Sequence, residues 1–499
     1  MLVYNRQVES YSDYICIVGA GPTGIFITHE LLGRGKKVLL IESGNFQSES
    51  ELLNYSNYYF ETPSMLPQNI HRIGGGGNYW IGRIGEFRDL DFEKIVGVRN
   101  ETWAFKKSQL EIYYRKCYES LLRTSVMDEE FINDNFQYSI LLPKELRMRP
   151  IRYADPKVFN ELLQDDLQNP NLTVMTDRVC LEISEDEETG SPVVKLQDIL
   201  KKVVNITPRD VVVAAGTLQS TKLVLSSPKI MQNLSKGIVG HYLMEHLEDY
   251  VGTLTISEKN IKTLFDLSLN RDRKLNNNVP KDFGVALGIA ECLSEQLSVL
   301  NISLEIIHLR TKYKFDPKDY QQKNQLLKAS SKTLFLLERI LRGSLNRVVS
   351  FVNSKILKRF KYSLWMKAEE LPFSESRVAI DNLNPNTLIY NHKVSVETSN
   401  EVRKALEIIK ELIEVNNLGH IEYYSEILKP NTILNMRPNW HPMGTLRIGN
   451  PTDSVVNENL LIHGTQHVYV LSPAVFPTGS NQNPVFTTLA LALKLADRL

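Results

Sequence analysis

A glycine-rich turn near the N-terminus constrains the fold of this chain more than any other feature. Residues 14–18 are a continuous apolar run of strand length, residues 19–24 read Gly-Ala-Gly-Pro-Thr-Gly, and residues 25–32 have a helical pattern. In such a unit the first glycine allows a tight turn, the second lets backbone approach a pyrophosphate, and the third lets helix and strand pack closely. The phosphates then lie at the N-terminus of the helix. The pattern predicts a parallel α/β unit that binds a dinucleotide through Gly19, Gly21, Pro22, Thr23 and Gly24.

An acidic residue at the expected distance supports this interpretation. The apolar stretch 37–41 predicts a second strand, and it ends in Glu42. An acid roughly 20 residues beyond the first glycine is placed to accept hydrogen bonds from a ribose. A chance glycine turn is the alternative, but it explains neither the flanking strand and helix nor the position of Glu42.

A second glycine-rich segment, residues 74–77, consists of four consecutive glycines. Four glycines are entropically unfavourable, so a close approach of the backbone to another group must require them. A flat ring would be such a group. A flexible linker is the alternative, and the aromatic residues that follow immediately disfavour it. We expect the cofactor to be contacted by Gly75, Gly76, Asn78, Tyr79 and Trp80.

The C-terminal segment contains a histidine and an asparagine that each precede a proline, His441 and Asn483. Between them lie an Ile-His-Gly turn and the short strand 467–471, and the chain closes in an apolar helical run over 486–499. Histidine has a pKa near neutral pH, so His441 suits a base that removes the proton of a hydroxyl group. The amide of Asn483 could orient that hydroxyl and stabilise the developing alkoxide. A structural N-cap or a hydrogen-bonded buried imidazole is the alternative for His441.

These motifs, in this order, resemble the glucose-methanol-choline (GMC) oxidoreductases, whose members bind FAD. The resemblance extends to the returning strand and turn at 211–220, to the segment Val-Gly-His-Tyr-Leu-Met-Glu-His at 239–246, and to Ser-Arg-Val at 376–378. It implies that His441 is the catalytic base of an "HPxGT" motif and that Asn483 is the second member of a histidine/asparagine pair. It also implies cofactor contacts from Val179, Ala215, Gly216, Ser472, Pro484 and Val485. For Val179, an ordinary strand valine is equally compatible with the sequence.

Departures from the family pattern refine the expected function. Tyr79 stands where some members carry the histidine that attaches the flavin, so we expect FAD to be bound non-covalently. Ser472 replaces an acidic residue that many members have before their "FPT" stretch. With the sequence at 479–484, this variant resembles the bacterial sugar-oxidising and pyranose-oxidase-like branches more than glucose oxidase or the aryl-alcohol oxidases.

We therefore expect an alcohol (CH–OH) of a sugar or glycoside to be oxidised to a carbonyl, with hydride transfer to flavin N5. Three alternatives stay open at this point: oxidation of a lipid, sterol or natural-product alcohol, a lyase reaction on the same scaffold, and an inactive flavoprotein that serves as a binding subunit. The electron acceptor could be oxygen, a quinone or a redox protein.

The expected fold is α/β (α+β overall), in two domains. Residues 1–249 and 431–499 form a discontinuous, Rossmann-like FAD-binding domain with a parallel sheet. Residues 250–430 carry no cofactor motif, and the resemblance implies that they form an inserted substrate-binding domain. Its antiparallel sheet is expected from strands 251–256, 284–290 and 299–309, with an amphipathic helix over 400–415.

Other elements are predicted between these motifs. Helices are expected over 102–122 and 155–166, and one strand over 172–183 that turns through a hairpin into 192–196. The stretch 43–67 is expected to be mostly loop.

The segment 332–361 is rich in lysine and arginine, and Glu338 is its only acidic residue. It predicts a basic amphipathic helical pair. This pair could lie on an anionic membrane, cover the mouth of the active site, make a contact between subunits, or pack on its own domain with a solvated basic face.

Composition excludes some function classes. Lys plus Arg equals Asp plus Glu, 58 against 58, which does not favour a nucleic-acid partner. Cys16, Cys117, Cys180 and Cys292 lack CxxC spacing and are expected to be buried thiols of a reducing compartment. No cluster has metal-ligand spacing and no GxSxG motif indicates a serine hydrolase. Because there is neither a signal-peptide pattern nor an apolar stretch of ~18 residues, a soluble cytoplasmic protein is expected.

Overall fold

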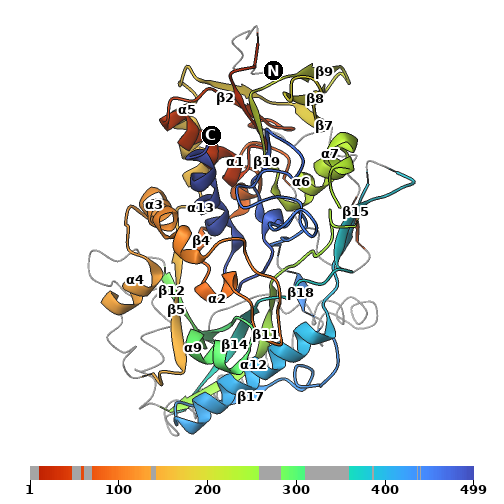
Figure 1. Ribbon diagram of the computed structural model, residues 1–499. Helices are drawn as coiled ribbons and strands as arrows, with labels where there is room; N and C mark the ends of the chain where they lie inside the picture. Colours follow the sequence, from red (N-terminus) through yellow and green to blue (C-terminus); the bar gives the residue numbers. More distant parts are fainter. Residues whose placement is uncertain are drawn as a thin grey trace, which may run out of the picture.

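The computed structural model describes residues 10–47, 58–60, 70–135, 142–235, 237–257, 283–308, 359–384, 387–434, 436–438 and 440–499. The chain forms two layered regions joined end to end, with the parallel sheet at one end and a large antiparallel sheet at the other (Figure 1). The C-terminus lies at the end that holds the parallel sheet. The segment 332–361 falls outside the described residues except for its last three.

The parallel sheet has the strand order β19-β10-β1-β2-β6, which confirms the predicted Rossmann-like core. Its strands are β1 (Ile15–Val18), β2 (Val38–Ile41), β6 (Leu172–Met175), β10 (Asp210–Val213) and β19 (Val468–Val470). Each strand pairs in parallel with its neighbour, and β1, β2, β10 and β19 are buried along their whole length. Continuous apolar runs are required there because helices cover both faces of such a sheet.

The helices of this region bring distant parts of the chain together. Helix α1 (Pro22–Gly33) packs against α5 (Val158–Asp166) and against the C-terminal helix α13 (Pro484–Ala496), which also contacts α3 (Glu111–Leu122). Helix α6 (Gly216–Leu225) and the short α7 (Pro228–Gln232) follow β10. Helix α13 is apolar on almost every side and is buried, as its sequence predicted. The two ends of the chain therefore share one core.

The large sheet has the order β17-β11-β14-β13-β12-β5-β4, and β18 also pairs with β11. All of its pairings are antiparallel, as predicted. Its strands are β4 (Arg83–Ile84), β5 (Leu146–Tyr153), β11 (Leu247–Ser257), β12 (Phe283–Ile289), β13 (Ile302–His308), β14 (Arg359–Ala368), β17 (His420–Tyr423) and β18 (Arg437–Pro438). Strands β4 and β5 precede residue 250, so the sheet also takes strands from the part of the chain assigned to the FAD-binding domain. The domain boundaries themselves stay a prediction.

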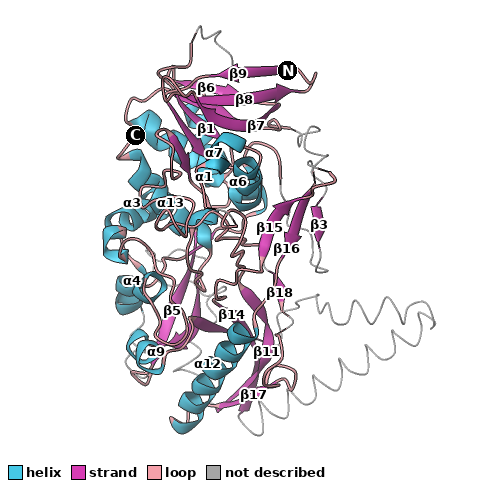
Figure 2. Ribbon diagram, turned by 45° about the vertical axis from the view of Figure 1, so that its right-hand side comes forward, coloured by secondary structure: helices cyan, strands magenta, loops and turns pink. Residues whose placement is uncertain are grey.

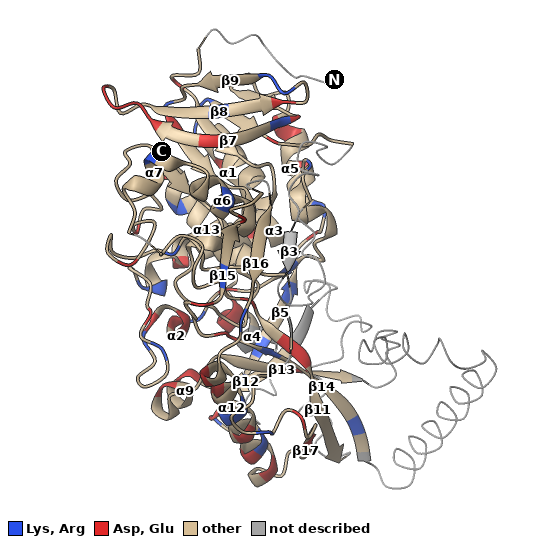
Figure 3. Cartoon of the chain, turned by 90° about the vertical axis from the view of Figure 1, so that its right-hand side faces the viewer, with Lys and Arg blue, Asp and Glu red and all other residues tan. Residues whose placement is uncertain are grey.

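Helix α12 (Val396–Val415) covers the large sheet, with Val402, Leu406 and Ile409 in the same core as β11 and β14. It begins at the N-cap Ser395, whose side chain accepts a hydrogen bond from the backbone N–H of Thr398. Figure 3 shows acidic and basic residues along α12, as expected of an amphipathic helix with one solvated face. The short helices α2 (Asp89–Phe92), α4 (Asp128–Asn135) and α9 (Glu291–Leu297) lie on this side of the molecule (Figure 1).

Two smaller sheets complete the fold (Figure 2). Strands β7 (Arg178–Glu185), β8 (Pro192–Asp198) and β9 (Val203–Ile206) form an antiparallel sheet. Strands β15 (Arg377–Ile380), β16 (Leu388–Asn391) and β3 (Tyr58–Phe60) form the other. The mixture of a parallel sheet with antiparallel sheets confirms the predicted fold class.

Several local predictions were wrong. The expected strand 172–183 is divided between β6 and β7, in different sheets, because the chain turns at Asp177, where φ is 56°. Helix 102–122 begins only with a 3-10 turn (Lys107–Gln109), ahead of α3. Residues 359–361 start a strand, β14, rather than ending a helix. The stretch 43–67, expected to be mostly loop, contains the three-residue strand β3, and its residues 48–57 and 61–67 lie outside the described residues. Cys292 is exposed, whereas Cys16 and Cys117 are buried as expected.

Among the described residues, no helix is both long and apolar enough to cross a membrane.

Candidate active site

A cavity of about 780 Å³ lies where the carboxyl ends of the parallel strands meet the large antiparallel sheet. Binding sites in parallel α/β sheets lie at this edge, and the volume is within the ~300–1,000 Å³ typical of ligand pockets. The cavity brings together three segments that are far apart in sequence: the N-terminal turn, the second glycine loop and the C-terminal segment. The predicted site residues that line it are Gly19, Gly21, Pro22, Thr23, Glu42, Gly75, Gly76, Tyr79, Trp80, Val179, Ala215, Gly216, His441, Asn483, Pro484 and Val485.

Three predicted cofactor residues do not line the cavity and instead shape its walls. A Cβ on Gly24 would lie 1.9 Å from the carbonyl oxygen of Gly19, so this glycine permits the close packing of α1 on the turn. Asn78 donates hydrogen bonds from Nδ2 to the carbonyls of Ile73 (2.9 Å) and Gly75 (3.0 Å) and thereby holds the glycine loop. Ser472 is buried and accepts a hydrogen bond from the backbone N–H of Ala474 at the start of the 3-10 turn Pro473–Val475. Contacts of Asn78 and Ser472 with the cofactor stay a prediction.

The two glycine loops, 19–24 and 74–77, and Glu42 form a cradle at one side of the cavity that fits the pyrophosphate and ribose of a dinucleotide. A Cβ on Gly21 would meet no atom within 4 Å, because this position faces the open cavity. Gly75 has φ +47°, and a Cβ there would lie 2.9 Å from the Cα of Gly21, so the two glycine loops meet backbone to backbone. Helix α1 begins at Pro22, and no side chain caps it at Gly21. Its first N–H groups are therefore left for an anionic group in the cavity.

The Glu42 carboxylate at the end of β2 is buried and held in place by backbone donors. Its Oε2 accepts a hydrogen bond from the backbone N–H of Ala20 (2.8 Å), and its Oε1 accepts from that of Ser43 (2.9 Å). Oε1 also accepts from the Ser43 hydroxyl (2.8 Å) and from the backbone N–H of Gly44 (3.2 Å), so acceptor capacity for a ribose hydroxyl remains only on Oε2. Glu42 thus lies where the sequence pattern predicted a ribose contact.

The imidazole of His441 contacts a second histidine. Its Nδ1 lies 3.2 Å from Nδ1 of His246, which is buried at the start of β11. One of these nitrogens must donate and the other accept. When His441 donates from Nδ1, its Nε2 is unprotonated and free to act as a base. Burial and, to a smaller extent, the nearby Lys367 ammonium lower the pKa of His441 to about 3, so the imidazole is neutral at pH 7.

The backbone of His441 is fixed by a buried polar network behind it. Its N–H donates to Oε2 of Glu245 (2.7 Å), and the Tyr390 hydroxyl donates to Oε1 of the same carboxyl group (2.8 Å). Glu370 accepts from the backbone N–H of Glu245 (2.7 Å) and forms an ion pair with His392 (2.8 Å). Burial raises the pKa of Glu245 to about 7. This network restricts the backbone of His441, so that its side chain stays at the wall of the cavity.

Asn483 is oriented by a buried lysine. Lys367 of β14 donates a short hydrogen bond to Oδ1 of Asn483, and its ammonium lies 3.1 Å from Oε1 of Glu248. Lys367 and Glu248 are register partners on β14 and β11. Because an ammonium can only donate, the amide oxygen of Asn483 is occupied, and its NH₂ group is left to donate into the cavity. Burial lowers the pKa of Lys367 to about 8, which leaves it mostly protonated at neutral pH.

The wall opposite the dinucleotide cradle carries charged and aromatic side chains. Arg83 and Glu305 form an ion pair at 2.6 Å, and Arg83, Glu248 and Lys367 line the cavity. Tyr79 and Trp440, which also line it, are 59% and 38% exposed, so they lie at its mouth. This part of the cavity is suited to a polar molecule.

Comparison with known proteins identifies this arrangement. Residues 372–492 match the family model of the GMC oxidoreductase C-terminal domain. These residues belong to the GMC oxidoreductase family. They contain His441 and Asn483, and the predicted resemblance is confirmed. A 2-methyl-1,2-propanediol dehydrogenase of Mycolicibacterium austroafricanum is 39% identical over 66 residues, which is 13% of this chain and 12% of the dehydrogenase.

Solved structures show that the fold of GMC oxidoreductases extends over the whole chain. A fungal aryl-alcohol oxidase is similar with a TM-score of 0.55 at 13% identity, over 98% of this chain and 99% of the oxidase. Pyridoxine 4-oxidase from Mesorbium loti (TM-score 0.53, 13% identity) aligns over 98% and 99% of the two chains. An FAD-dependent oxidoreductase from Chaetomium thermophilum (TM-score 0.54, 13% identity) aligns over 97% and 98%. FAD is thus the cofactor of this fold family, and the cradle described above fits it.

Sequence reasoning missed two histidines of this GMC site. Neither His246 nor His71 is among the predicted site residues. His246 nevertheless contacts His441, and His71 lines the cavity with a pKa that burial lowers to about 4. The position of His246 at the end of the 239–246 motif was the available signal. His463 bonds to Ser454 (3.0 Å) and to the carbonyl of Gly449 (3.2 Å), which supports the structural role expected of it.

The structure also assembles a group that sequence spacing could not show. Ligand atoms of His246, Glu248 and His441 all lie within 4.8 Å of one another, close enough to hold a metal ion. We assign no metal here, because the two imidazoles bond to each other and the Lys367 ammonium lies beside Glu248.

Proposed function

We propose that this chain is an FAD-dependent oxidoreductase that oxidises a CH–OH group of a polar, hydroxyl-rich alcohol, with a sugar or glycoside as the leading substrate. The observation that carries the proposal is the pair His441 and Asn483, which face one cavity together with the dinucleotide cradle. FAD, when bound there, supplies an acceptor for the hydride that leaves the alcohol carbon. The protein must then remove the hydroxyl proton and stabilise charge on the oxygen.

The two side chains are prepared for these tasks. His441 is neutral at pH 7 because burial lowers its pKa to about 3, so its lone pair is available, although a pKa this low makes it a weaker base than a free imidazole. Its Nδ1 is occupied by His246, and Nε2 is the nitrogen left to take the substrate proton. The NH₂ group of Asn483 is oriented by Lys367 and donates to the substrate oxygen as charge develops on it. Glu248 favours the imidazolium that forms at His441.

The charged wall favours a sugar over a lipid or sterol. The ion pairs Lys367–Glu248 (3.1 Å) and Arg83–Glu305 (2.6 Å) add up to no net charge, but they present both donors and acceptors. Hydroxyl groups of a sugar can replace the water that solvates such pairs. An apolar substrate would leave the charged groups without that compensation, at a cost of several kcal/mol. The aromatic residues Tyr79 and Trp440 at the mouth support the same conclusion.

We further propose that FAD is held without a covalent bond, since the loop position that would carry an attaching histidine is Tyr79. The nature of the electron acceptor, the cytoplasmic location, any homo-oligomer and the role of the basic segment 332–361 stay predictions.

The test is anaerobic reduction of the bound flavin by candidate alcohols. Free sugars and glycosides should bleach the flavin absorbance of the wild-type protein, whereas sterols and long-chain alcohols should not. His441→Ala should retain the yellow cofactor but be reduced about 10²- to 10⁴-fold more slowly. His420→Ala is the matched control, because His420 is exposed and pairs only with Glu414 on the surface.

The outcomes separate the competing functions. Product formation without bleaching would indicate a lyase, and bleaching by sterols alone would indicate an apolar substrate. Failure of every alcohol to reduce a fully loaded protein would indicate an inactive flavoprotein. Equal reduction rates in the wild type and His441→Ala would remove His441 from the mechanism.

A further inference from the structure

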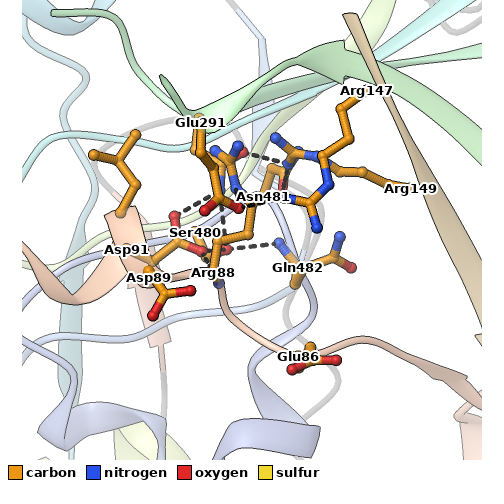
Figure 4. Close-up of polar contacts among 12 residues, drawn as sticks. Glu86, Arg88, Asp89, Asp91, Arg147, Arg149, Glu291, Ser480, Asn481 and Gln482 are labelled. Atoms are coloured by element: carbon orange, nitrogen blue, oxygen red, sulfur yellow. Dashed lines mark hydrogen bonds and ion pairs between the residues drawn. The ribbon is translucent and has the colours of Figure 1, made fainter. Parts of the chain in front are cut away.

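A cluster of buried arginines lies behind the loop that carries Asn483 (Figure 4). Arg88 precedes helix α2, and Arg149 lies on β5; they are only 6% and 5% exposed. Arg147, also on β5, forms the rim of the cluster with Glu291 at 2.9 Å. In Figure 4 these three arginines gather around Glu291 and Asn481.

The hydrogen bonds of this cluster leave donors without acceptors. All three guanidinium nitrogens of Arg88 are buried without a hydrogen-bond partner among the described residues. The same holds for Nε and Nη2 of Arg149 and for Nδ2 of Asn481. The nearest carboxylate oxygen recorded for Arg88, Oε1 of Glu291, is 3.9 Å from Nε. Buried donors are nearly always satisfied in folded proteins, so this group requires an explanation.

The acceptors that surround the cluster are already in use. Asp91 accepts from the Ser480 hydroxyl (2.7 Å) and the backbone N–H of Arg88 (2.8 Å) through Oδ2, and from Nδ2 of Asn301 (2.5 Å) through Oδ1. The amide oxygens of Asn301 and Asn481 both accept from Nη1 of Arg149, at 2.5 and 2.7 Å. Among the described residues, no acceptor lies within hydrogen-bonding distance of the three guanidinium nitrogens of Arg88 or of Nε and Nη2 of Arg149.

Arg88 also lacks a close counter-ion. Arg99 pairs with Glu369, and Arg147 pairs with Glu291 at 2.9 Å, whereas the nearest carboxylate oxygen recorded for a nitrogen of Arg88 is 3.9 Å away. A buried charge without a close partner is strongly unfavourable.

We propose that the space between Arg88, Arg149 and Asn481 is a binding site for a small monovalent anion, such as a halide or formate. Such a ligand accepts hydrogen bonds without donating any, which matches a site composed only of donors. It also supplies the missing negative charge. Arg149 holds Asn481, two residues before Asn483, and Asp91 holds Ser480 in the same loop. The anion therefore stabilises the loop that presents Asn483 to the substrate cavity.

The test is thermal unfolding of the FAD-loaded protein in sodium chloride, sodium bromide or sodium formate against sodium gluconate at equal ionic strength. We expect a saturable rise of the unfolding midpoint by a few degrees in the small anions, with no such rise in gluconate, whose anion is too large. Crystals soaked in bromide should show an anomalous peak within hydrogen-bonding distance of both Arg88 and Arg149.

Variants assign the effect to this cluster. Arg88→Met should lose the saturable rise and the bromide peak, whereas Arg115→Met should keep both, because Arg115 is exposed and pairs with Glu130 elsewhere. If Arg88→Met does not fold, the unfolding midpoints and the bromide soak of the wild-type protein still test whether the cluster binds an anion. The same midpoint in chloride and gluconate, together with no bromide peak at the cluster, would show that water fills the site and would overturn the proposal.

Discussion

The contact between His246 and His441 predicts a large difference between two substitutions at one position. His246→Leu removes the acceptor for the Nδ1 hydrogen of His441, whereas His246→Asn can place an amide oxygen near the site of the lost nitrogen. In the leucine variant, a buried N–H is left without a partner, at a cost of about 1–3 kcal/mol. His441 avoids this cost by moving its proton to Nε2, the nitrogen that must accept the substrate proton. A penalty of this size corresponds to flavin reduction about 5- to 150-fold slower than in the wild type.

The assay is anaerobic stopped-flow reduction of the flavin with an alcohol that reduces the wild-type protein. His246→Asn should remain within a few-fold of the wild type, and His246→Leu should lose the rate by the larger factor at unchanged flavin content. The tautomer has a spectroscopic readout of its own, since ¹⁵N chemical shifts of the imidazole distinguish a protonated Nδ1 from a protonated Nε2. Equal rates in the two variants, or a His441 tautomer that does not change with the residue at 246, would refute this reasoning.

Three further changes probe the cradle, the base and the core. Gly21→Ala should fold normally but bind FAD poorly, because the added methyl group enters the open cavity. The control is Gly33→Ala, whose Cβ also meets no atom within 4 Å but lies away from the cavity. The measurement is the flavin content of each variant after purification. The pKa of His441 falls from 6.5 to about 3 on folding, so in this pH range the unfolded state binds more protons. The contribution of His441 to stability therefore decreases as the pH drops from 6.5 towards 3, and urea unfolding at several pH values should show a flatter profile for His441→Gln. Arg99→Met should lower the free energy of unfolding by about 3–5 kcal/mol at pH 8, where the buried Glu369 must either lose its partner or bind a proton; a change below 1 kcal/mol would contradict this.

The parallel half of the fold could be predicted because its signals are local. The strand, turn and helix around Gly19 to Gly24 are contiguous, and strands buried on both faces must be apolar throughout. The ends of elements were predicted less well. The turn at Asp177 lacks a glycine or proline, so nothing in the pattern separates β6 from β7.

The partners of the catalytic residues could not be predicted because they depend on pairing between distant strands. His246 and His441 are 195 residues apart, and only the folded chain brings their imidazoles together. Lys367 lies on β14, a strand in which successive side chains point to opposite faces of the sheet. The sequence of β14 does not show which of these faces points to the cavity. Its position beside Asn483 follows from the register that pairs it with Glu248. A shift of that register by one residue would turn Lys367 away from the cavity.

The same geometry explains why family motifs identify the chemistry here but leave the substrate open. The cradle and the pair His441 and Asn483 are contributed by segments around the parallel sheet, and these segments carry the recognisable motifs. The opposite wall is contributed by β4, β11 and β14 of the large sheet, through Arg83, Glu248 and Lys367. Because Lys367 both bonds Asn483 and lines the substrate wall, a substitution there should change substrate preference and hydride transfer together. If Asn483 acts as proposed, specificity is coupled to the orientation of its amide, and a change of substrate requires a replacement at 367 that still holds the Asn483 oxygen.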